Sequence, residues 1–299
     1  MSFATGLKTI VVAVNLEGSS GGAMEYARKL AGAYGARLVL VYSADPKEFA
    51  SVEEVPGSVK NALAPEVAEE LERMGAELLR EGIHSHSEVR QGMVADMLVA
   101  AAKQNEADLI VVGTEGRFGA GPLLVGSLAE ELVRKSPMAV LAVASDWNAG
   151  PFRPVPGGPV LLALQKDEAT GAAIEAARSL AETFERPLLV LHARSAQEAT
   201  ANLNPCMSTL KGFGLDRNPK INLRCIVKDG NPSDAVAQAV SQHHPSILVM
   251  GVKRMSESGR QHGTAFTLLA RSKVPVLCVP PSSRRREEND EHLSVAGAR

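Results

Sequence analysis

The sequence has 299 residues, of which 45% are hydrophobic and 22% are charged, and its formal net charge at pH 7 is -2. This composition is typical of a folded globular protein and excludes a largely disordered chain. The near-neutral charge gives no electrostatic reason to expect a nucleic-acid partner, and the length favours two domains of about 150 residues over a single one.

The amino terminus, MSFATGLKTIVVAVN, lacks the charged start, long apolar stretch and small-residue cleavage site of a signal peptide. Apolar runs elsewhere are too short to cross a bilayer. The three cysteines, Cys206, Cys225 and Cys278, occur without CxxC spacing, and an odd number is poor material for a disulfide framework. We therefore expect a cytoplasmic protein in a reducing compartment, with no membrane partner.

The first half alternates short β-branched runs with longer runs rich in Ala, Leu and Glu that have helical spacing. Strands are predicted at 8–14, 37–43, 85–90, 108–113 and 138–144, and helices at 20–34, 64–82, 94–105 and 126–135. Several of these strands are almost continuously apolar, as strands covered by helices on both faces must be. The pattern therefore predicts a parallel α/β sheet.

The second half repeats this pattern. LIVVG, which ends at Gly113, recurs as ILVMG, which ends at Gly251, and Gly92 recurs at the same offset as Gly230. The first strand recurs at 160–165. Such internal similarity indicates a duplicated domain.

The repeat sets the expected domain boundaries. We expect one domain over 1–146 and a second over 158–281, joined by a segment rich in Pro and Gly that contains Trp147. The last strand of the second domain is predicted at 274–280. The mixed charge and low apolar content of 282–299 predict a disordered tail.

A glycine-rich loop, TEGRFGAGPLLVGS, follows the strand that ends at Gly113. Glycines let the backbone turn sharply and approach an anion closely, and the free N–H groups at a helix start favour phosphate. Open α/β sheets bind ligands beyond the carboxyl ends of strands, where the strand order reverses. The spacing of Gly113, Gly116, Gly126 and Ser127 therefore predicts a phosphate-binding loop, although an ordinary βα turn with a serine cap would also use these residues.

The segment GTEGRFGAGPLLVGSLAEELVRKSPMAVLAV resembles the ATP-binding motif and final strand of the universal stress protein family. GMVADMLVAAAKQNEADLIVVG resembles the family's third helix and fourth strand, and TIVVAVN resembles its first strand. The resemblance covers both halves, the first more closely, and identifies a tandem UspA-like member. It implies an α/β fold of two tandem doubly wound parallel five-stranded sheets with strand order 3-2-1-4-5, of the Rossmann-like class shared with adenine nucleotide alpha hydrolases.

The resemblance also implies ATP, with or without Mg²⁺, as the ligand of the first domain. Backbone groups near the ends of the first two strands would hold adenine, and the glycine loop would line the ribose and phosphates. Carried over by position, the residues that would contact the base are Ala13, Val14 and Ser43. Those that would line the ribose and phosphates are Gly113, Gly116, Arg117, Gly126, Ser127 and Leu128. Members that bind ATP usually have Asp where this chain has Asn15, and loss of that charge is expected to weaken binding by roughly 1 kcal/mol.

The second half departs further from the family pattern. In GVKRMSESGRQHGTAF, Arg254 replaces the second glycine and the loop is shorter, and Gln165 replaces the acidic residue. No ATP is expected in this degenerate site. In the family the fifth strands of two domains commonly pair, so strands 138–144 and 275–279 are candidates to join the halves as an intramolecular pseudo-dimer. A homodimer of whole chains is also compatible with the family.

No nucleophile elbow, Walker loop or dinucleotide fingerprint is present, and the acidic residues around the glycine loop are Glu115, Glu130 and Glu131. His84 and His86 share one strand face, but two ligands without a third are too few for a metal site. No catalytic residue is therefore assigned. The sequence favours a stress-response regulatory protein that binds ATP and an unspecified protein partner. A slow ATPase or nucleotidylyl-transferring enzyme, and a scaffold without nucleotide, are the alternatives.

Overall fold

The structure, a computed structural model, describes residues 3–15, 21–43, 65–114, 127–144, 157–165, 167–194, 198, 205–253, 267–269, 272 and 274–282. The first half contains the short helix η1 (Phe3–Thr5), strands β1 (Thr9–Val14), β2 (Arg37–Ser43), β3 (Ser85–Arg90), β4 (Leu109–Gly113) and β5 (Ala139–Val143), and helices α1 (Gly21–Tyr34), α2 (Pro65–Arg80), α3 (Val94–Gln104) and α4 (Ser127–Lys135). Every strand and helix predicted for this half is present, within two residues of its predicted ends.

The second half repeats the order of elements. Its strands are β6 (Val160–Ala163), β7 (Leu188–Arg194), β8 (Leu223–Asp229), β9 (Ile247–Gly251) and β10 (Val276–Val279), and its helices are α5 (Thr170–Thr183), α7 (Pro205–Gly212), η4 (Leu215–Arg217) and α8 (Pro232–His243). The predicted linker around Trp147 and almost all of the predicted tail lie outside the described residues.

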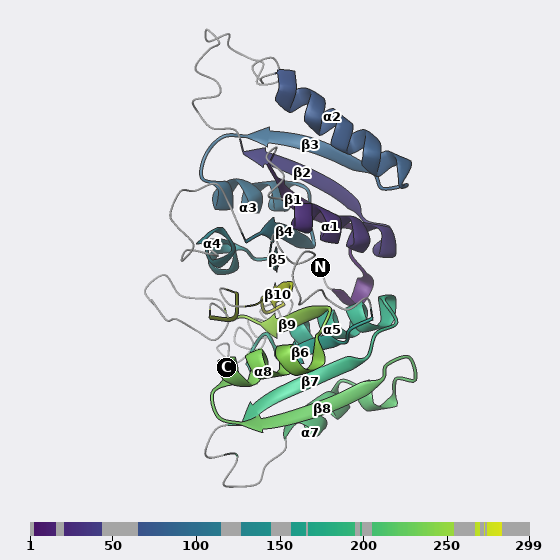
Figure 1. Cartoon of the computed structure of the whole chain (residues 1–299), viewed down its shortest axis with the longest axis vertical. Helices are drawn as coiled ribbons and strands as arrows, with labels where there is room; N and C mark the ends of the chain where they lie inside the picture. The colour runs from purple at the N-terminus through teal and green to yellow at the C-terminus, as the bar shows by residue number, and fades with distance from the viewer. Residues whose placement is uncertain are drawn as a thin grey trace, which may run out of the picture.

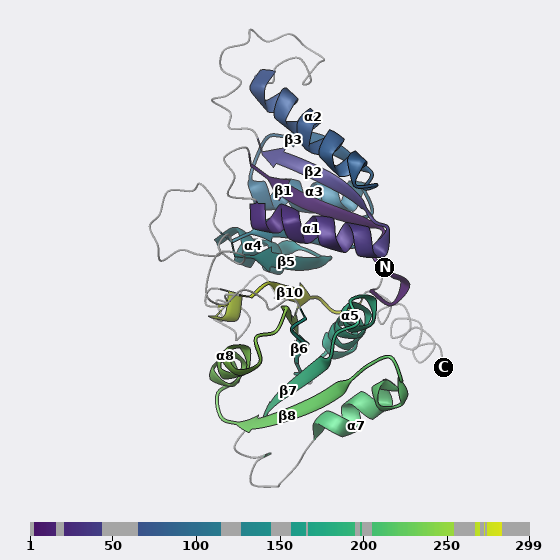
Figure 2. The same ribbon diagram turned by 45° about the vertical axis from the view of Figure 1, so that its right-hand side comes forward.

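All ten strands form one sheet, in the order β3-β2-β1-β4-β5-β10-β9-β6-β7-β8 (Figures 1 and 2). Within each half the strands are parallel and follow the predicted order 3-2-1-4-5, which confirms the fold class. The halves meet where β5 and β10 pair antiparallel, with Leu141 opposite Leu277. The two strands expected to join the halves are therefore the ones in contact.

Helices cover both faces of this sheet. Successive residues of a strand point to opposite faces, so each inner strand contributes side chains to both core layers. In β1, Ile10 and Val12 belong to the core layer that includes α1, α2, α5 and α7, whereas Val11 belongs to the layer that includes α3, α4 and α8. All three side chains are fully buried. Burial on both faces explains why the inner strands are continuously apolar in the sequence.

The two halves also touch through helices α1 and α5, which lie side by side on one face (Figure 2). The hydroxyl of Tyr34 lies 3.0 Å from Ser179 Oγ, and its ring packs edge-on against Phe184 with the ring centroids 6.4 Å apart. The hydroxyl of Tyr26 donates to the carbonyl of Ser246 at 3.3 Å. A shared sheet and a helix contact therefore hold the halves together. Among the described helices, none is long and apolar enough to cross a membrane.

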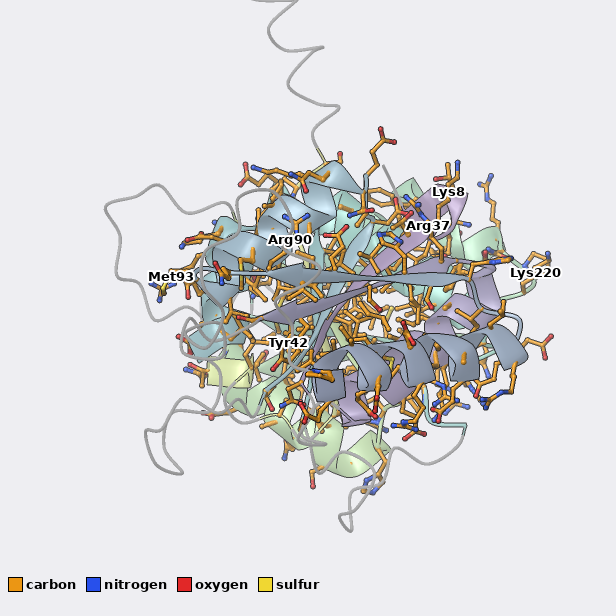
Figure 3. The ribbon with its side chains drawn as sticks, turned by 90° about the horizontal axis from the view of Figure 1, so that it is seen from above. Lys8, Arg37, Tyr42, Arg90, Met93 and Lys220 are labelled. Atoms are coloured by element: carbon orange, nitrogen blue, oxygen red, sulfur yellow. The ribbon has the colours of Figure 1, made fainter. Side chains whose placement is uncertain are left out.

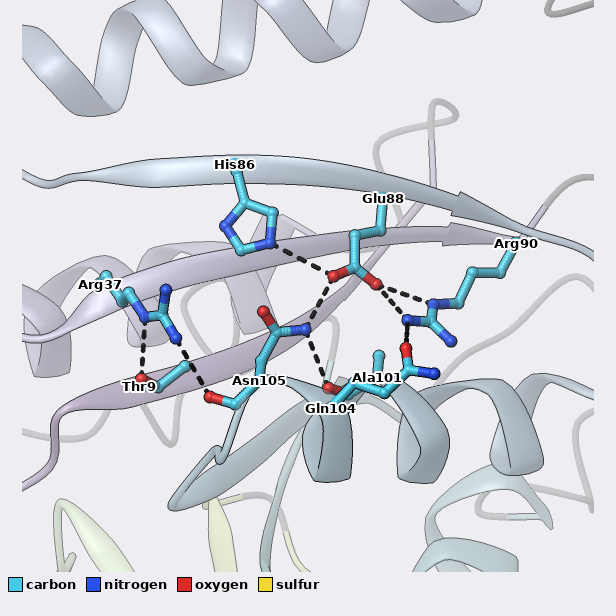
Figure 4. A network of polar contacts seen from close by, with 8 residues as sticks. All are labelled: Thr9, Arg37, His86, Glu88, Arg90, Ala101, Gln104 and Asn105. Carbon is cyan, nitrogen blue, oxygen red and sulfur yellow. Dashed lines mark hydrogen bonds and ion pairs between the residues drawn. The ribbon is translucent and has the colours of Figure 1, made fainter. Parts of the chain in front are cut away.

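A polar network covers one face of the edge strand β3 (Figure 4). The Glu88 carboxylate accepts hydrogen bonds from Asn105 Nδ2 at 2.7 Å and Arg90 Nε at 2.8 Å, and it lies 3.3 Å from His86 Nε2. These contacts tie β3 to the carboxyl end of α3. His86 therefore contacts the carboxylate of Glu88. The described part of the chain has no group of three or more His, Cys, Asp or Glu residues that could hold a metal ion.

Candidate functional site

The carboxyl ends of β1 and β4 flank the point where the strand order of the first half reverses. β1 pairs with β2 to the end of β1, and β4 pairs with β5 along the whole length of both strands. Between themselves, β1 and β4 pair only as far as Val12 and Val111, although β1 runs to Val14 and β4 to Gly113. The two central strands therefore separate before either one ends, at the place where open α/β sheets bind ligands.

The residues predicted to contact the base lie together at this edge. Ala13 and Val14 are the last two residues of β1, Asn15 follows them, and Ser43 is the last residue of β2. Ala13, Asn15 and Ser43 are partly exposed, whereas the Val14 side chain is buried. When the molecule is viewed along its long axis, Met93 marks this carboxyl side of β2 and β3, opposite to Lys8 and Arg37 (Figure 3). This edge therefore carries both backbone and side-chain polar groups.

The two ends of the predicted phosphate loop reach the same edge. Gly113 ends β4 and is partly exposed, and α4 begins at Ser127, followed by Leu128. The loop residues predicted to contact the ligand between these points, Gly116, Arg117 and Gly126, lie outside the described residues. The structure thus fixes where the loop leaves the sheet and where the helix begins, and the ligand contacts of all these residues stay predictions.

The same position in the second half differs in its strand pairing. β6 pairs with β9 to its last residue, with Ala163 opposite Met250. Beyond that pair, a Cβ atom on Gly251 would lie only 3.0 Å from the Cβ of Ala169. Ala169 is fully buried. The turn between β6 and α5 therefore packs directly on the carboxyl end of β9.

Hydrogen bonds hold this turn in place. Thr170 Oγ1 donates to the carbonyl of Gln165 at 2.5 Å and accepts the Asp167 N–H at 2.8 Å. Asp167 Oδ1 in turn accepts the Ala169 N–H at 2.9 Å. The turn also explains why β6 ends at Ala163, two residues before the predicted end of the strand. That this half does not bind ATP stays a prediction.

A cavity of about 240 Å³ lies nearby, at the carboxyl ends of β6 and β7 and under the start of α8. His192, which is 5% exposed, donates through Nδ1 to the carbonyl of Leu164 at 3.3 Å. Its Nε2 lies 3.5 Å from a carboxylate oxygen of Glu198, which also lines the cavity. This pair lies near the equivalent of the base-binding edge of the first half. Sequence reasoning missed it, and the only signal was a histidine directly after the apolar run LLVL.

A cavity of about 1090 Å³ lies between the halves. From the first half it is lined by residues at the amino ends of β4 and β5, including Asp108 and Ala139, and from the second half by Glu168 and Phe213. The glycine loop leaves β4 at the opposite, carboxyl end. This cavity is therefore separate from the predicted nucleotide site.

The duplicated parallel domains and the open strand edge define a tandem Rossmann-like α/β protein. The model of the universal stress protein family matches residues 6–144 and again residues 158–280. The chain therefore belongs to the universal stress protein family and carries two of its domains in tandem.

Individual relatives agree with this assignment. Over 139 residues, 46% of this chain, it is 30% identical to a universal stress protein of Methanocaldococcus jannaschii, of which 81% is covered. It is 31% identical over 46% of its length to a universal stress protein of Thermus aquaticus, of which 98% is covered. A universal stress protein structure from Archaeoglobus fulgidus matches 92% of this chain and 98% of that chain, with a TM-score of 0.69 and 17% identity. That last likeness concerns the fold alone.

Proposed function

We propose that the first domain of this universal stress protein binds an adenine nucleotide, with ATP as the preferred ligand. The observation that carries the proposal is the separation of β1 from β4 beyond Val12 and Val111, directly before a glycine-rich loop. Adenine would lie against the ends of β1 and β2, near Ala13 and Ser43. The phosphates would lie in the loop, ahead of α4.

The chemistry of the loop supports a polyphosphate ligand. The first N–H groups of a helix have no intrahelical partner, and the helix dipole favours negative charge there, so the start of α4 is suited to an anion. A Mg²⁺ ion would reach the site with the nucleotide, because magnesium is commonly bound through phosphates and waters with one or two protein carboxylates. Asn15 is expected to leave binding weaker than Asp would.

The described surroundings support a regulatory use of the nucleotide better than rapid hydrolysis. Of the acidic residues near the loop, Glu131 forms an ion pair with Lys135 at 2.7 Å, and the same ammonium group contacts Asp96. A general base must instead be free to take a proton from the reacting group. In the proposal, ATP occupancy of the first domain biases the conformation or partner choice of an intramolecular pseudo-dimer whose second domain is expected to bind none.

Titration calorimetry with MgATP on the full chain tests this function. We expect saturable binding of one nucleotide per chain, and the absence of saturation below about 1 mM would overturn the proposal. Phosphate release measured on the same protein separates binding from turnover. Release no faster than in a Gly116→Arg variant supports a binding protein, and clearly faster release would show that the protein is an ATPase.

A further inference from the structure

Three sulfur atoms of the second domain converge between α7 and β8. Cys206 and Met207 lie in the first turn of α7, and Cys225 lies in the middle of β8. The Cys225 thiol donates to Met207 Sδ across 3.1 Å. The Cys206 thiol is in hydrogen-bonding contact with that of Cys225. Two cysteines 19 positions apart in the sequence are therefore brought side by side by the packing of a helix on a strand.

The two thiols differ in their access to solvent. Cys206 is fully buried in the core layer under α7, whereas Cys225 is partly exposed on β8, which pairs only with β7 at the end of the sheet. Burial, and then the hydrogen bond to Cys225, raise the pKa of the Cys206 thiol. Thiolate and access to solvent are what an oxidant requires. Cys225 is therefore the thiol that reacts first, and Cys206 lies next to it on the buried side.

We infer that Cys206 and Cys225 form a reversible disulfide when the protein meets a peroxide. The Cys225 thiolate attacks one peroxide oxygen, so that an S–O bond forms, the O–O bond breaks, and the departing hydroxide takes a proton to become water. The sulfur of Cys206 then attacks the sulfenic sulfur, the S–S bond forms, and the hydroxyl group leaves as water with the Cys206 proton. Both thiols are oxidised together, and one peroxide is reduced to two waters.

The modification is specific to the second domain. Cys225 lies opposite Val190 in the pairing of β8 with β7, and in the corresponding pairing of β3 with β2 the residue is Ser87, opposite Leu40. The first domain therefore has no thiol at this position. The disulfide would tie α7 to β8 and close the chain between them, which removes freedom from the unfolded chain. The domain that we expect not to bind ATP would thus respond to oxidation.

Thiol counting on the full chain tests the inference. After treatment with hydrogen peroxide and then denaturation, the number of free thiols should fall from three to one per chain, and peptide mass mapping should find Cys206 linked to Cys225. Dithiothreitol should restore all three. The midpoint of thermal unfolding should rise by several degrees in the oxidised protein.

Cys278 provides the matched control. It is also fully buried, and burial raises its pKa to about 12, but it lies on β10 in the other core layer. Cys278→Ser should still lose two thiols, whereas Cys206→Ser and Cys225→Ser should form no intramolecular disulfide. Three intact thiols with Met207 sulfoxide, or linkage only between chains, would overturn the inference. Peptide mapping of the unaltered chain keeps the test valid if a variant does not fold, and no outcome depends on nucleotide binding.

Discussion

The two domains share one strand order but differ where that order reverses. In the first, β1 and β4 separate after Val12 and Val111. In the second, β6 stays paired with β9 to its end, and Ala169 packs against Gly251. The sheet depends on long apolar runs, whereas its ligand edge depends on a few turn residues. The two domains thus share their strand order and differ in the pairing at its reversal, which illustrates why function must be argued from the site.

The largest expected effect comes from exchanging the residues that distinguish the two loops. Gly116→Arg should weaken MgATP binding by at least about 100-fold, because a long cationic side chain replaces a residue that lets the backbone approach the phosphates. Arg254→Gly restores the second glycine in the other domain, but Gln165 and the shorter loop remain. Calorimetry should therefore give one nucleotide per chain for Arg254→Gly. Two nucleotides per chain would contradict the proposed difference between the domains.

A second substitution tests the packing of Ala169 on Gly251 by its effect on the free energy of unfolding. Gly251→Ala places a Cβ atom 3.0 Å from that of Ala169, so the free energy of unfolding should fall by about 1–3 kcal/mol in urea titrations. Ala169→Gly in the same chain should recover part of this loss, since the two side chains compete for one space. Equal stability of Gly251→Ala and the unaltered protein would mean that the turn does not pack on β9.

A smaller effect is expected at the ends of the first strands. Asn15→Asp should tighten MgATP binding several-fold, because a hydrogen bond from the ligand to a charged acceptor exceeds one to a neutral acceptor by roughly 1 kcal/mol. Gln165→Glu is the corresponding change in the second domain and should leave both affinity and stoichiometry unchanged. Weaker binding by Asn15→Asp would place the ligand elsewhere.

The smallest effect concerns the edge strands. Glu88 is partly buried, which raises its pKa, but hydrogen bonds from Asn105, Arg90 and His86 outweigh burial and hold the pKa of this carboxyl below its usual value near 4.5. A carboxyl whose pKa is lower in the folded state than in the unfolded state stabilises the folded protein at pH values above the unfolded pKa. This stabilisation is lost as the pH falls through the folded pKa. Glu88→Gln should therefore be less stable at pH 7, and the difference should shrink below about pH 4. Thermal unfolding of both proteins across this range measures it.

The second domain supplies the contrast for that prediction. On β8, Lys228 Nζ donates to Gln238 Oε1 at 2.5 Å, so its partner is neutral and does not titrate in acid. Lys228→Gln should consequently change stability by a similar amount at pH 4 and pH 7. A loss confined to neutral pH would show that an acidic group takes part in this contact.

Much of the fold could be predicted because it depends on local sequence. Continuous apolar runs such as LIVVG mark strands buried on both faces, and their repetition in ILVMG reveals the second domain. The ends of the predicted ligand edge, at Val14 and Gly113, follow from where those runs stop. Order 3-2-1-4-5 came from the family resemblance, since periodicity alone does not specify which strands are neighbours.

The remaining features depend on contacts between distant residues. Nothing in the sequence shows that Ala169 covers Gly251 or that His192 approaches Glu198. An odd number of cysteines argued against a disulfide framework, yet the packing of α7 on β8 brings two of the three together. Such contacts arise only when helices dock on the sheet, so spacing along the chain could not predict them.

A crystal structure of the full chain grown with MgATP would show directly whether the first domain binds the nucleotide. We expect one nucleotide per chain, with its base against the ends of β1 and β2 and its phosphates in the loop that follows Gly113. We expect no nucleotide beside Gly251. A correctly folded first domain with that edge empty at saturating ATP, or a nucleotide bound in the second domain instead, would contradict it.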